Sequence, residues 1–288
     1  MKEPLNIVTI VAKNYLAHAR TLVDSFHKYN PAGEAFVLLA DHVDSYFDPK
    51  QERFNLIEIE ELRNEIPHLD AFCFQYSVIE LSTALKPFLL KYLFRKFNIA
   101  KLAYFDPDIL ITDNLDYISK LLEKYNIVLI PHITTPFSDN RKPSELELLR
   151  AGTYNLGFIG MANKETSISM LNWWGKRLKK QCIIDFSQGL FVDQKWIDLV
   201  PGLFPGVYIL REPGYNVAYW NLHERKITIE DQKIYCNGKP LYFFHFSGFS
   251  PERDKEISKH QNRYKFSQIG QASNLFQLYT KLLIQNGY

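Results

Sequence analysis

Cysteine is scarce in this sequence, with Cys73, Cys182 and Cys236 the three among 288 residues. They lie far apart and are odd in number, a pattern that fits neither a disulfide framework nor a Cys-x-x-Cys metal clip. We therefore expect a reducing compartment, with the three thiols buried as small hydrophobic side chains.

The sequence also lacks a long hydrophobic run and an excess of one charge. No stretch approaches the ~20 apolar residues that a membrane-spanning helix needs, and the N-terminal residues lack a signal-peptide pattern. Lys and Arg number 34 against 32 Asp and Glu, a net charge of +2. The basic residues form no stripe, which argues against a nucleic-acid partner. We expect a cytoplasmic protein that is not transmembrane.

Several nucleotide-binding and catalytic motifs are missing as well. No Gly-x-Gly-x-x-Gly follows the first predicted strand, and no Gly-Lys-Ser/Thr phosphate loop occurs. The Gly-x-Ser-x-Gly and His-Glu-x-x-His motifs are absent too. If this protein binds a phosphate, side chains and a metal ion must hold it.

Strand and helix patterns alternate along the chain. Apolar runs without alternation, which are typical of parallel strands covered on both faces, predict strands at 5–12, 35–40, 55–59, 101–111, 127–130 and 155–161. Helical spacing predicts helices at 14–29, 82–97, 165–180, 191–199 and 273–285. Short strands are predicted at 207–210 and 217–220, with a hairpin turning at Asn237-Gly238. This succession predicts one α/β domain whose single mixed, mostly parallel sheet is flanked by helices.

The triplet Asp106-Pro107-Asp108 interrupts the apolar run at 101–111. Because Pro107 restricts the residue before it to extended geometry, we expect both carboxylates to project from the same face of the chain. Two ionised carboxylates this close repel each other unless a cation lies near them. A divalent ion that also binds a diphosphate would supply this positive charge. The alternative is an ordinary turn with solvated carboxylates, but ligands of open α/β sheets bind at strand ends such as this one.

His245 is a candidate third metal ligand, and it is the single polar ring in the aromatic run 243–249. The alternative is a hydrogen-bonded core histidine. If His245 joins Asp106 and Asp108, the mixed nitrogen and oxygen set favours Mn²⁺ over Ca²⁺ and also accommodates Mg²⁺.

Six short motifs occur in order along the chain: Val11-Ala12-Lys13-Asn14-Tyr15, Lys86-Pro87-Phe88, Tyr104-Phe105-Asp106-Pro107-Asp108, Tyr154-Asn155-Leu156-Gly157, Val192-Asp193-Gln194 and His245-Phe246-Ser247-Gly248. In this order they resemble nucleotide-sugar glycosyltransferases of the GT-A fold, most closely the family-8-like bacterial enzymes. The resemblance covers about residues 5–263. It implies one GT-A domain over 1–288, with a nucleotide-binding part at about 1–112 and a donor- and acceptor-binding part at about 113–288.

The resemblance implies transfer of a hexosyl group from a nucleoside diphosphate sugar, with a UDP-sugar favoured, to an acceptor hydroxyl with retention of configuration. It implies that Asp106, Asp108 and His245 bind Mn²⁺, or Mg²⁺ in its place, and that Asp193 and Gln194 face the reactive sugar carbon. The nucleotide-sugar site it implies consists of Ala12, Asn14, Tyr15, Lys86, Asp106, Asp108, Asn155, Gly157, Gly248 and Arg253.

The sequence departs from the family at two places. Arg253 stands in for a lysine that commonly follows the His-x-x-Gly stretch, and Lys13 lies where an acidic residue is common nearby. The acceptor is left open between a glycan, a protein and a lipid, and the chain could be a module of a larger polypeptide. The alternatives are a carbohydrate-binding module without activity and a sugar-1-phosphate nucleotidyltransferase, although the glycine-rich signature of the latter is missing.

Overall fold

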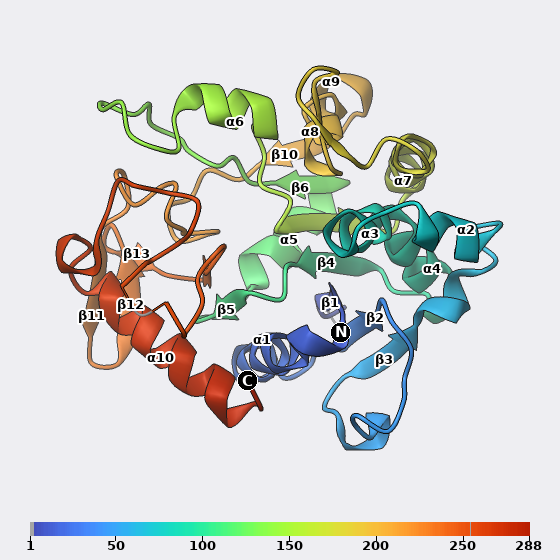
Figure 1. The fold of residues 1–288 in the computed structure, drawn as a ribbon, viewed down its shortest axis with the longest axis horizontal. Helices are drawn as coiled ribbons and strands as arrows, with labels where there is room; N and C mark the ends of the chain where they lie inside the picture. The colour runs from blue at the N-terminus through green and yellow to red at the C-terminus, as the bar shows by residue number, and fades with distance from the viewer. Residues whose placement is uncertain (1–2, 254) are drawn as a thin grey trace.

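Residues 3–253 and 255–288 are described by a computed structural model (Figure 1), in which seven strands form the central sheet. Their order across the sheet is β10 (Val207–Ile209), β6 (Ile127–Leu129), β7 (Phe158–Ala162), β4 (Lys101–Phe105), β1 (Asn6–Val11), β2 (Ala35–Leu39) and β3 (Asn55–Glu58). Strand β7 runs antiparallel to both of its neighbours, and the other neighbouring strands run parallel. The predicted α/β class with a mixed, mostly parallel sheet is confirmed.

Both faces of this sheet are buried against helices. Leu102 and Tyr104 of β4 belong to the core that contains α4 (Lys86–Phe97) and α7 (Glu165–Leu178), whereas Ala103 and Phe105 belong to the core beneath α1 (Leu16–Tyr29) and α5 (Asp116–Lys124). Successive side chains of a strand point to opposite faces, so a strand covered on both faces shows no hydrophobic alternation.

A third core lies beside the main sheet, on the left in Figure 1. There α10 (Ala272–Gln285) packs near the antiparallel strands β11 (Ile227–Glu230), β12 (Lys233–Cys236) and β13 (Lys239–Pro240), which include the predicted turn at Asn237-Gly238. The same core receives β5 (Ile109–Ile111) and β14 (Phe243–His245), which pair with each other antiparallel.

The remaining elements are α2 (Leu69–Phe74), α3 (Val78–Ala84), α6 (Glu145–Ala151), β8 (Ile184–Asp185), β9 (Leu190–Phe191), α8 (Gln194–Ile197), α9 (Val200–Leu203) and the short 3-10 helices Lys13–Tyr15, Pro49–Gln51, Ile59–Leu62 and Phe266–Gln268.

Several predicted element boundaries are wrong for local reasons. The run 101–111 is two strands, β4 and β5, that belong to different sheets. The predicted helix 82–97 is two helices, because α4 begins anew at Lys86 with Pro87 in its first turn, where a missing N–H is tolerated. Residues 217–220 form no strand, although Val217 makes one isolated bridge to Phe244.

The predicted helix 191–199 is also wrong. Phe191 ends strand β9, and Val192 has a φ of 40°, which interrupts any helix at this point. Two four-residue helices, α8 and α9, follow, and Pro201 lies in the first turn of α9 instead of ending a helix. Among the described residues, none of the helices combines the length and the apolar character that a membrane crossing requires.

Gly33 lies in the turn that connects α1 to β2, where the surrounding atoms pack closely against its backbone. A Cβ at this position would lie 2.3 Å from the carbonyl oxygen of Leu5 and 2.6 Å from Cζ of Phe26. We expect Gly33→Ala to lower the free energy of unfolding by about 1–3 kcal/mol, because backbone and core must both shift. Gly202→Ala, whose Cβ would meet nothing within 4 Å, is the control and should stay within about 0.5 kcal/mol of wild type. Urea unfolding measures both, and equal midpoints would contradict this account of the contact.

Candidate functional site

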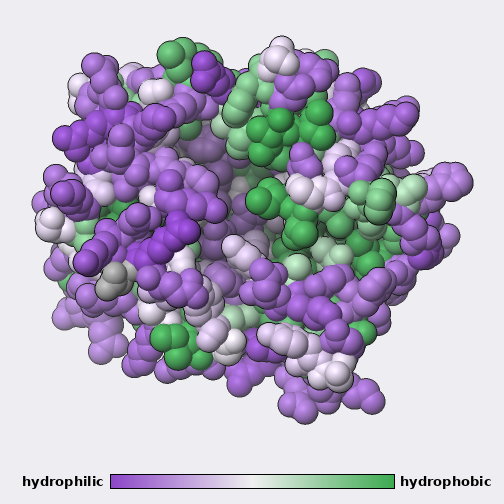
Figure 2. Space-filling model, viewed as in Figure 1, coloured by the Kyte–Doolittle hydropathy of each residue, from purple (hydrophilic) through white to green (hydrophobic). Residues whose placement is uncertain are grey.

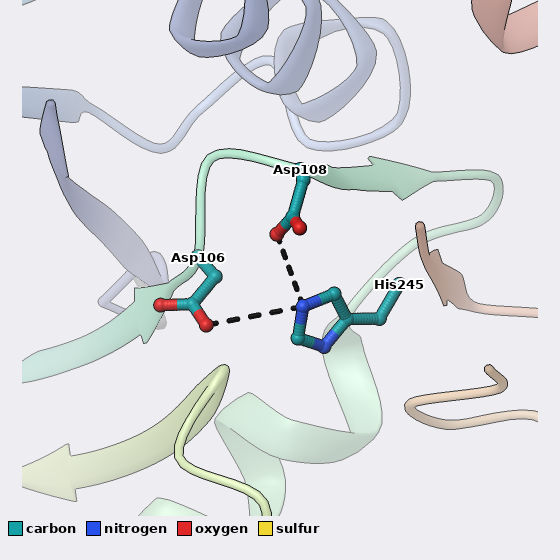
Figure 3. A group of neighbouring side chains, drawn as sticks. All are labelled: Asp106, Asp108 and His245. Carbon is teal, nitrogen blue, oxygen red and sulfur yellow. Dashed lines mark ion pairs between the residues drawn. The ribbon is translucent and has the colours of Figure 1, made fainter. Parts of the chain in front are cut away.

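Asp106 and Asp108 lie where the chain leaves β4 and turns into β5 (Figure 3). The expected extended geometry is wrong, because Pro107 and Asp108 form a turn. The turn is held on both sides: the N–H of Asp106 donates to the carbonyl of Gly157, and the N–H of Phe246 donates to the carbonyl of Asp108, each at 2.8 Å. The turn nevertheless directs both carboxylates toward one point.

His245 faces that point from the neighbouring strand. Strand β14 pairs with β5 in a register that places His245 opposite Ile109, directly after Asp108. Its Nε2 lies 3.0 Å from Oδ1 of Asp108 and 3.8 Å from Oδ2 of Asp106 (Figure 3). One ligand atom from each of the three residues lies within 4.8 Å of the others. Two carboxylates and one imidazole are a donor set that suits Mn²⁺ or Mg²⁺.

The amide of Asn155 sets the orientation of the His245 ring. Oδ1 of Asn155 lies 3.0 Å from Nδ2 of Asn216 and 3.2 Å from the backbone nitrogen of Gly157, and both of these are donors. Nδ1 of His245 lies 3.2 Å from the same oxygen. Because an amide oxygen only accepts hydrogen bonds, Nδ1 must carry the proton. Nε2 then faces the carboxylates with the lone pair that a metal ion needs.

His132 completes this network on the other side of Asn155. Nδ2 of Asn155 lies 3.3 Å from Nε2 of His132, and Nδ1 of His132 lies 3.2 Å from the carbonyl of Thr153. A neutral ring with its proton on Nδ1 satisfies both contacts. Trp220 covers the two imidazoles, with ring centres 5.3 Å from His132 and 5.2 Å from His245.

The charges of the site are mutually paired, with His245 buried and the side chains of Asp106 and Asp108 29% and 24% exposed. Burial by itself would raise the pKa of Asp108, but the nearby His245 lowers it overall. Burial would likewise lower the pKa of His245, but Asp108 and Asp106 raise it overall. Without a metal ion the imidazole therefore favours its charged form, and a bound divalent ion would replace that proton.

Lys86 supplies a second positive charge beside the carboxylates. Its side chain is 2% exposed, and its Nζ lies 2.9 Å from Oδ2 of Asp193 and 3.6 Å from Oδ1 of Asp106. Nζ also donates to the carbonyl of Leu156 at 2.9 Å and lies 4.4 Å from the ring centre of Tyr104. Burial opposes the charge on Lys86, yet the two carboxylates raise its pKa overall. Lys86 therefore remains charged.

Asp193 and Gln194 lie at the start of α8, directly after β9. Burial raises the pKa of Asp193 against the opposing effect of Lys86. The amide of Gln194 is held at both ends, because its Oε1 accepts from the N–H of Leu156 and its Nε2 donates to the carbonyl of Ala151, each at 2.9 Å. Both side chains therefore have a fixed position.

A cavity of about 560 Å³ lies between these groups. It is lined by most of the residues assigned to the sugar and the metal ion: Lys86, Asp106, Asn155, Gly157, Asp193, Gln194 and His245. Asp108 joins them through its ion pair with His245. This volume is within the range of small-molecule sites, about 300–1,000 Å³.

The residues expected to hold the nucleoside lie apart from this cavity lining. Ala12, Asn14 and Tyr15 follow the carboxyl end of β1, and Tyr15 is 43% exposed and stacks on His18 at 4.5 Å. Burial and, to a smaller extent, the charge of Asp108 raise the pKa of Tyr15.

The two remaining predicted positions follow β14. Gly248 has a φ of 71° and lies against His260, whose Cδ2 would be 2.5 Å from an added Cβ. His260 lines the cavity, and Gly248 does not. Arg253 is exposed on the surface, where it pairs with Glu256 at 3.9 Å, and it is not among the cavity-lining residues.

Sequence reasoning missed His132, Asn216, Tyr104 and His260. His132 carried a usable signal, because it follows the strand at 127–130 much as Asp106 follows the strand at 101–105, and both positions end at the ligand-binding edge of the sheet. Asn216 and His260 lie in irregular segments, and nothing local marks them.

A comparison with protein-family models finds no match. Two proteins of Bacillus subtilis (strain 168) are similar in sequence. "Uncharacterized protein YfnF" is 28% identical over 263 residues, 87% of this chain and 84% of that protein. "Uncharacterized protein YfnD" is 25% identical over 255 residues, 87% of this chain and 79% of that protein.

Solved structures of glycosyltransferases share the fold. The galactosyltransferase LgtC, in complex with donor and acceptor sugar analogs, has a TM-score of 0.54 and 13% identity, and the match covers 98% of this chain and 96% of LgtC. The glycosyltransferase GlyE of Streptococcus pneumoniae TIGR4 has a TM-score of 0.54 and 14% identity, covering 99% of this chain and 63% of GlyE. The chain has the GT-A fold.

Gly157 tests the proposed position of the histidine ligand. A Cβ at this residue would lie 2.3 Å from Cε1 of His245 and 2.8 Å from Oδ1 of Asn155. We expect Gly157→Ala to displace the ring and weaken Mn²⁺ binding about 10–100-fold, as loss of support around a metal ligand does. Titration calorimetry with Mn²⁺ measures this, with Gly202→Ala as the control. An unchanged affinity would exclude His245 as a ligand in this position.

His132 gives a pH-dependent prediction. Burial lowers its pKa to about 4, whereas the unfolded chain binds this proton near pH 6.5. The folded state is therefore destabilised as the pH falls from about 6.5 toward 4, by up to about 1.4 kcal/mol per pH unit.

Two measurements test this prediction. NMR should show a neutral His132 ring with its proton on Nδ1 at pH 5.5, and the pH dependence of unfolding should be shallower in His132→Phe. A ring that titrates near pH 6.5 would contradict the assigned hydrogen bonds.

Proposed function

We propose that this protein is a glycosyltransferase that moves a hexosyl group from a nucleoside diphosphate sugar, with a UDP-sugar favoured, to an acceptor hydroxyl. The observation that carries the proposal is the convergence of Asp106, Asp108 and His245 beside a cavity at the strand ends of a GT-A fold. A buried imidazole oriented by Asn155 toward two carboxylates supports a metal site over a solvated turn.

Asp106, Asp108 and His245 would hold Mn²⁺ or Mg²⁺. Such an ion supplies Lewis-acid charge to the departing diphosphate, an effect worth several kcal/mol in comparable sites. Ala12, Asn14 and Tyr15 at the end of β1 would hold the nucleoside, where the exposed part of the Tyr15 ring is available to stack on a base. The LgtC structure contains donor and acceptor sugar analogs, which is consistent with this use of the fold.

Lys86 and Asp193 would act on the sugar. The 2.9 Å ion pair with Lys86 favours the ionised form of Asp193 against the effect of burial, and such a carboxylate would stabilise positive charge that develops at the anomeric carbon. The same pairing weakens Asp193 as a nucleophile, which favours attack by the acceptor on the face that the diphosphate leaves, with retention. Gln194 would present a fixed amide beneath the sugar, since both of its ends are bound to backbone.

Donor hydrolysis tests the proposal. A panel of UDP-, GDP- and dTDP-sugars is incubated with the protein, with and without Mn²⁺, and release of the nucleoside diphosphate is followed. We expect slow, Mn²⁺-dependent release from one class of donor. In Asp108→Asn the release should fall at least about 100-fold, because loss of the ion removes several kcal/mol of stabilisation.

Asp116→Asn is the control, since this carboxylate is exposed in the first turn of α5 and does not line the cavity. Its rate should match wild type. If no donor is hydrolysed and no nucleotide raises the melting temperature in the presence of Mn²⁺, the transferase proposal fails and a glycan-binding module becomes the better explanation.

A further inference from the structure

The cavity has a polar side and an apolar side. The polar side contains the groups described above, and the apolar side contains Ile79 of α3 together with Ile184, Phe186 and Phe191 of the β8–β9 hairpin. Figure 2 shows the molecule hollowed near the centre of this face, with hydrophobic residues gathered along the right of the hollow and hydrophilic residues along its left. One opening therefore offers two kinds of surface.

Three of the apolar side chains are unusually accessible. Ile79 is 68% exposed, Phe186 is 54% exposed and Ile184 is 52% exposed. Large apolar side chains scattered singly over a surface need no explanation, but a group of them at the edge of a cavity marks a binding groove. None of the three offers a side-chain hydrogen-bond donor or acceptor, so this surface is poorly suited to the hydroxyls of a sugar.

The hairpin holds its apolar residues in this exposed position. Its turn is closed by Asp185, which accepts from Oγ of Ser187 at 2.5 Å and from Nε2 of Gln188 at 2.6 Å. The ring of Phe186 stacks on that of Phe191, with centres 5.9 Å apart and planes inclined by 16°. The polar side chains of the turn thus form hydrogen bonds with one another, and Phe186 lines the cavity.

The apolar surface is also continuous with the reacting groups. Strand β9 leads through Val192 directly to Asp193 and Gln194, and α3 is followed at once by Lys86. A molecule whose hydroxyl reaches the sugar beside Asp193 can place its adjoining part along these two segments, which both line the cavity. The adjoining part therefore meets Phe186, Ile79 and Ile184.

We propose that the acceptor carries an apolar aglycone, alkyl or aromatic, next to its accepting hydroxyl or sugar, and that Phe186, Ile79 and Ile184 select for it. This inference rests on the proposed transferase function, because it assigns the apolar surface to the acceptor. It predicts that affinity depends on the aglycone more than on the sugar to which the aglycone is attached.

Matched glycosides test this selection. Methyl, n-octyl and 4-nitrophenyl β-D-glucosides, each below its aggregation limit, are titrated into the protein with UDP and Mn²⁺ present, and ligand-observed NMR measures their affinities. Because each buried methylene strengthens binding about fourfold, we expect the octyl or the nitrophenyl glucoside to bind at least about tenfold more tightly than the methyl glucoside. Tighter binding of the octyl glucoside would indicate an alkyl aglycone, and tighter binding of the nitrophenyl glucoside would indicate an aromatic one.

Substitutions on the apolar side of the cavity test which residues cause the preference for an apolar aglycone. Phe186→Ser and Ile79→Ser should each reduce the aglycone preference several-fold, and the double variant should abolish it, with melting temperatures confirming that the variants fold. Leu203→Ser is the matched control, because Leu203 on α9 is also 54% exposed but does not line the cavity. It should retain the full preference.

The outcomes separate this inference from the proposed function. If wild type hydrolyses a donor but binds the three glucosides equally, or if Leu203→Ser loses the preference as much as Phe186→Ser does, the inference is overturned. If the preference maps to Phe186 while no donor is hydrolysed and no nucleotide raises the melting temperature in the presence of Mn²⁺, the apolar subsite stands and the transferase proposal fails.

Discussion

The pairing of β5 with β14 is the constraint on which the site depends. It joins the segment after Asp108 to the segment that ends at His245, two regions far apart in sequence, and its register decides which side chain faces the carboxylates. A shift of one residue would turn His245 to the opposite face of the strand and replace it with a phenylalanine, since Phe244 and Phe246 flank it. The aromatic core around α10 buries both of these rings, which holds the register that the proposed metal site needs.

The need to balance buried charge accounts for the types of residue found around this strand pairing. Asp106, Asp108 and Asp193 place three carboxylates in a largely buried region, and Lys86 compensates one of them. His245 compensates a second only while it is protonated. The proposed divalent ion, bound to the neutral imidazole, would compensate the remaining two charges, and its binding would be coupled to loss of the imidazole proton. Burying the carboxylates without such compensation would be costly.

The sequence predicted the parts of this arrangement that local patterns determine. Continuous apolar runs marked the strands covered on both faces, and the position of Asp106 and Asp108 at a strand end marked the ligand-binding edge. The turn geometry at Pro107 was not predictable, because proline after aspartate fits both an extended chain and a turn. The links from Asn155 to His132, Asn216 and His245 join positions from distant segments, and no short window of sequence contains that information.

Val192 shows how the two sides of the cavity are joined. A β-branched residue with positive φ is unfavourable, and such a conformation costs of the order of 1–3 kcal/mol unless its surroundings impose it. Here the N–H of Val192 donates to the carbonyl of Ile183 at 3.0 Å, and Nε1 of the buried Trp174 donates to the carbonyl of Asp193 at 3.2 Å. The first bond ties the residue to the base of the hairpin, and the second ties the next residue to α7. The strained residue therefore lies between the apolar hairpin and the carboxylate that pairs with Lys86, and these bonds fix the position of Asp193 relative to the apolar side of the cavity.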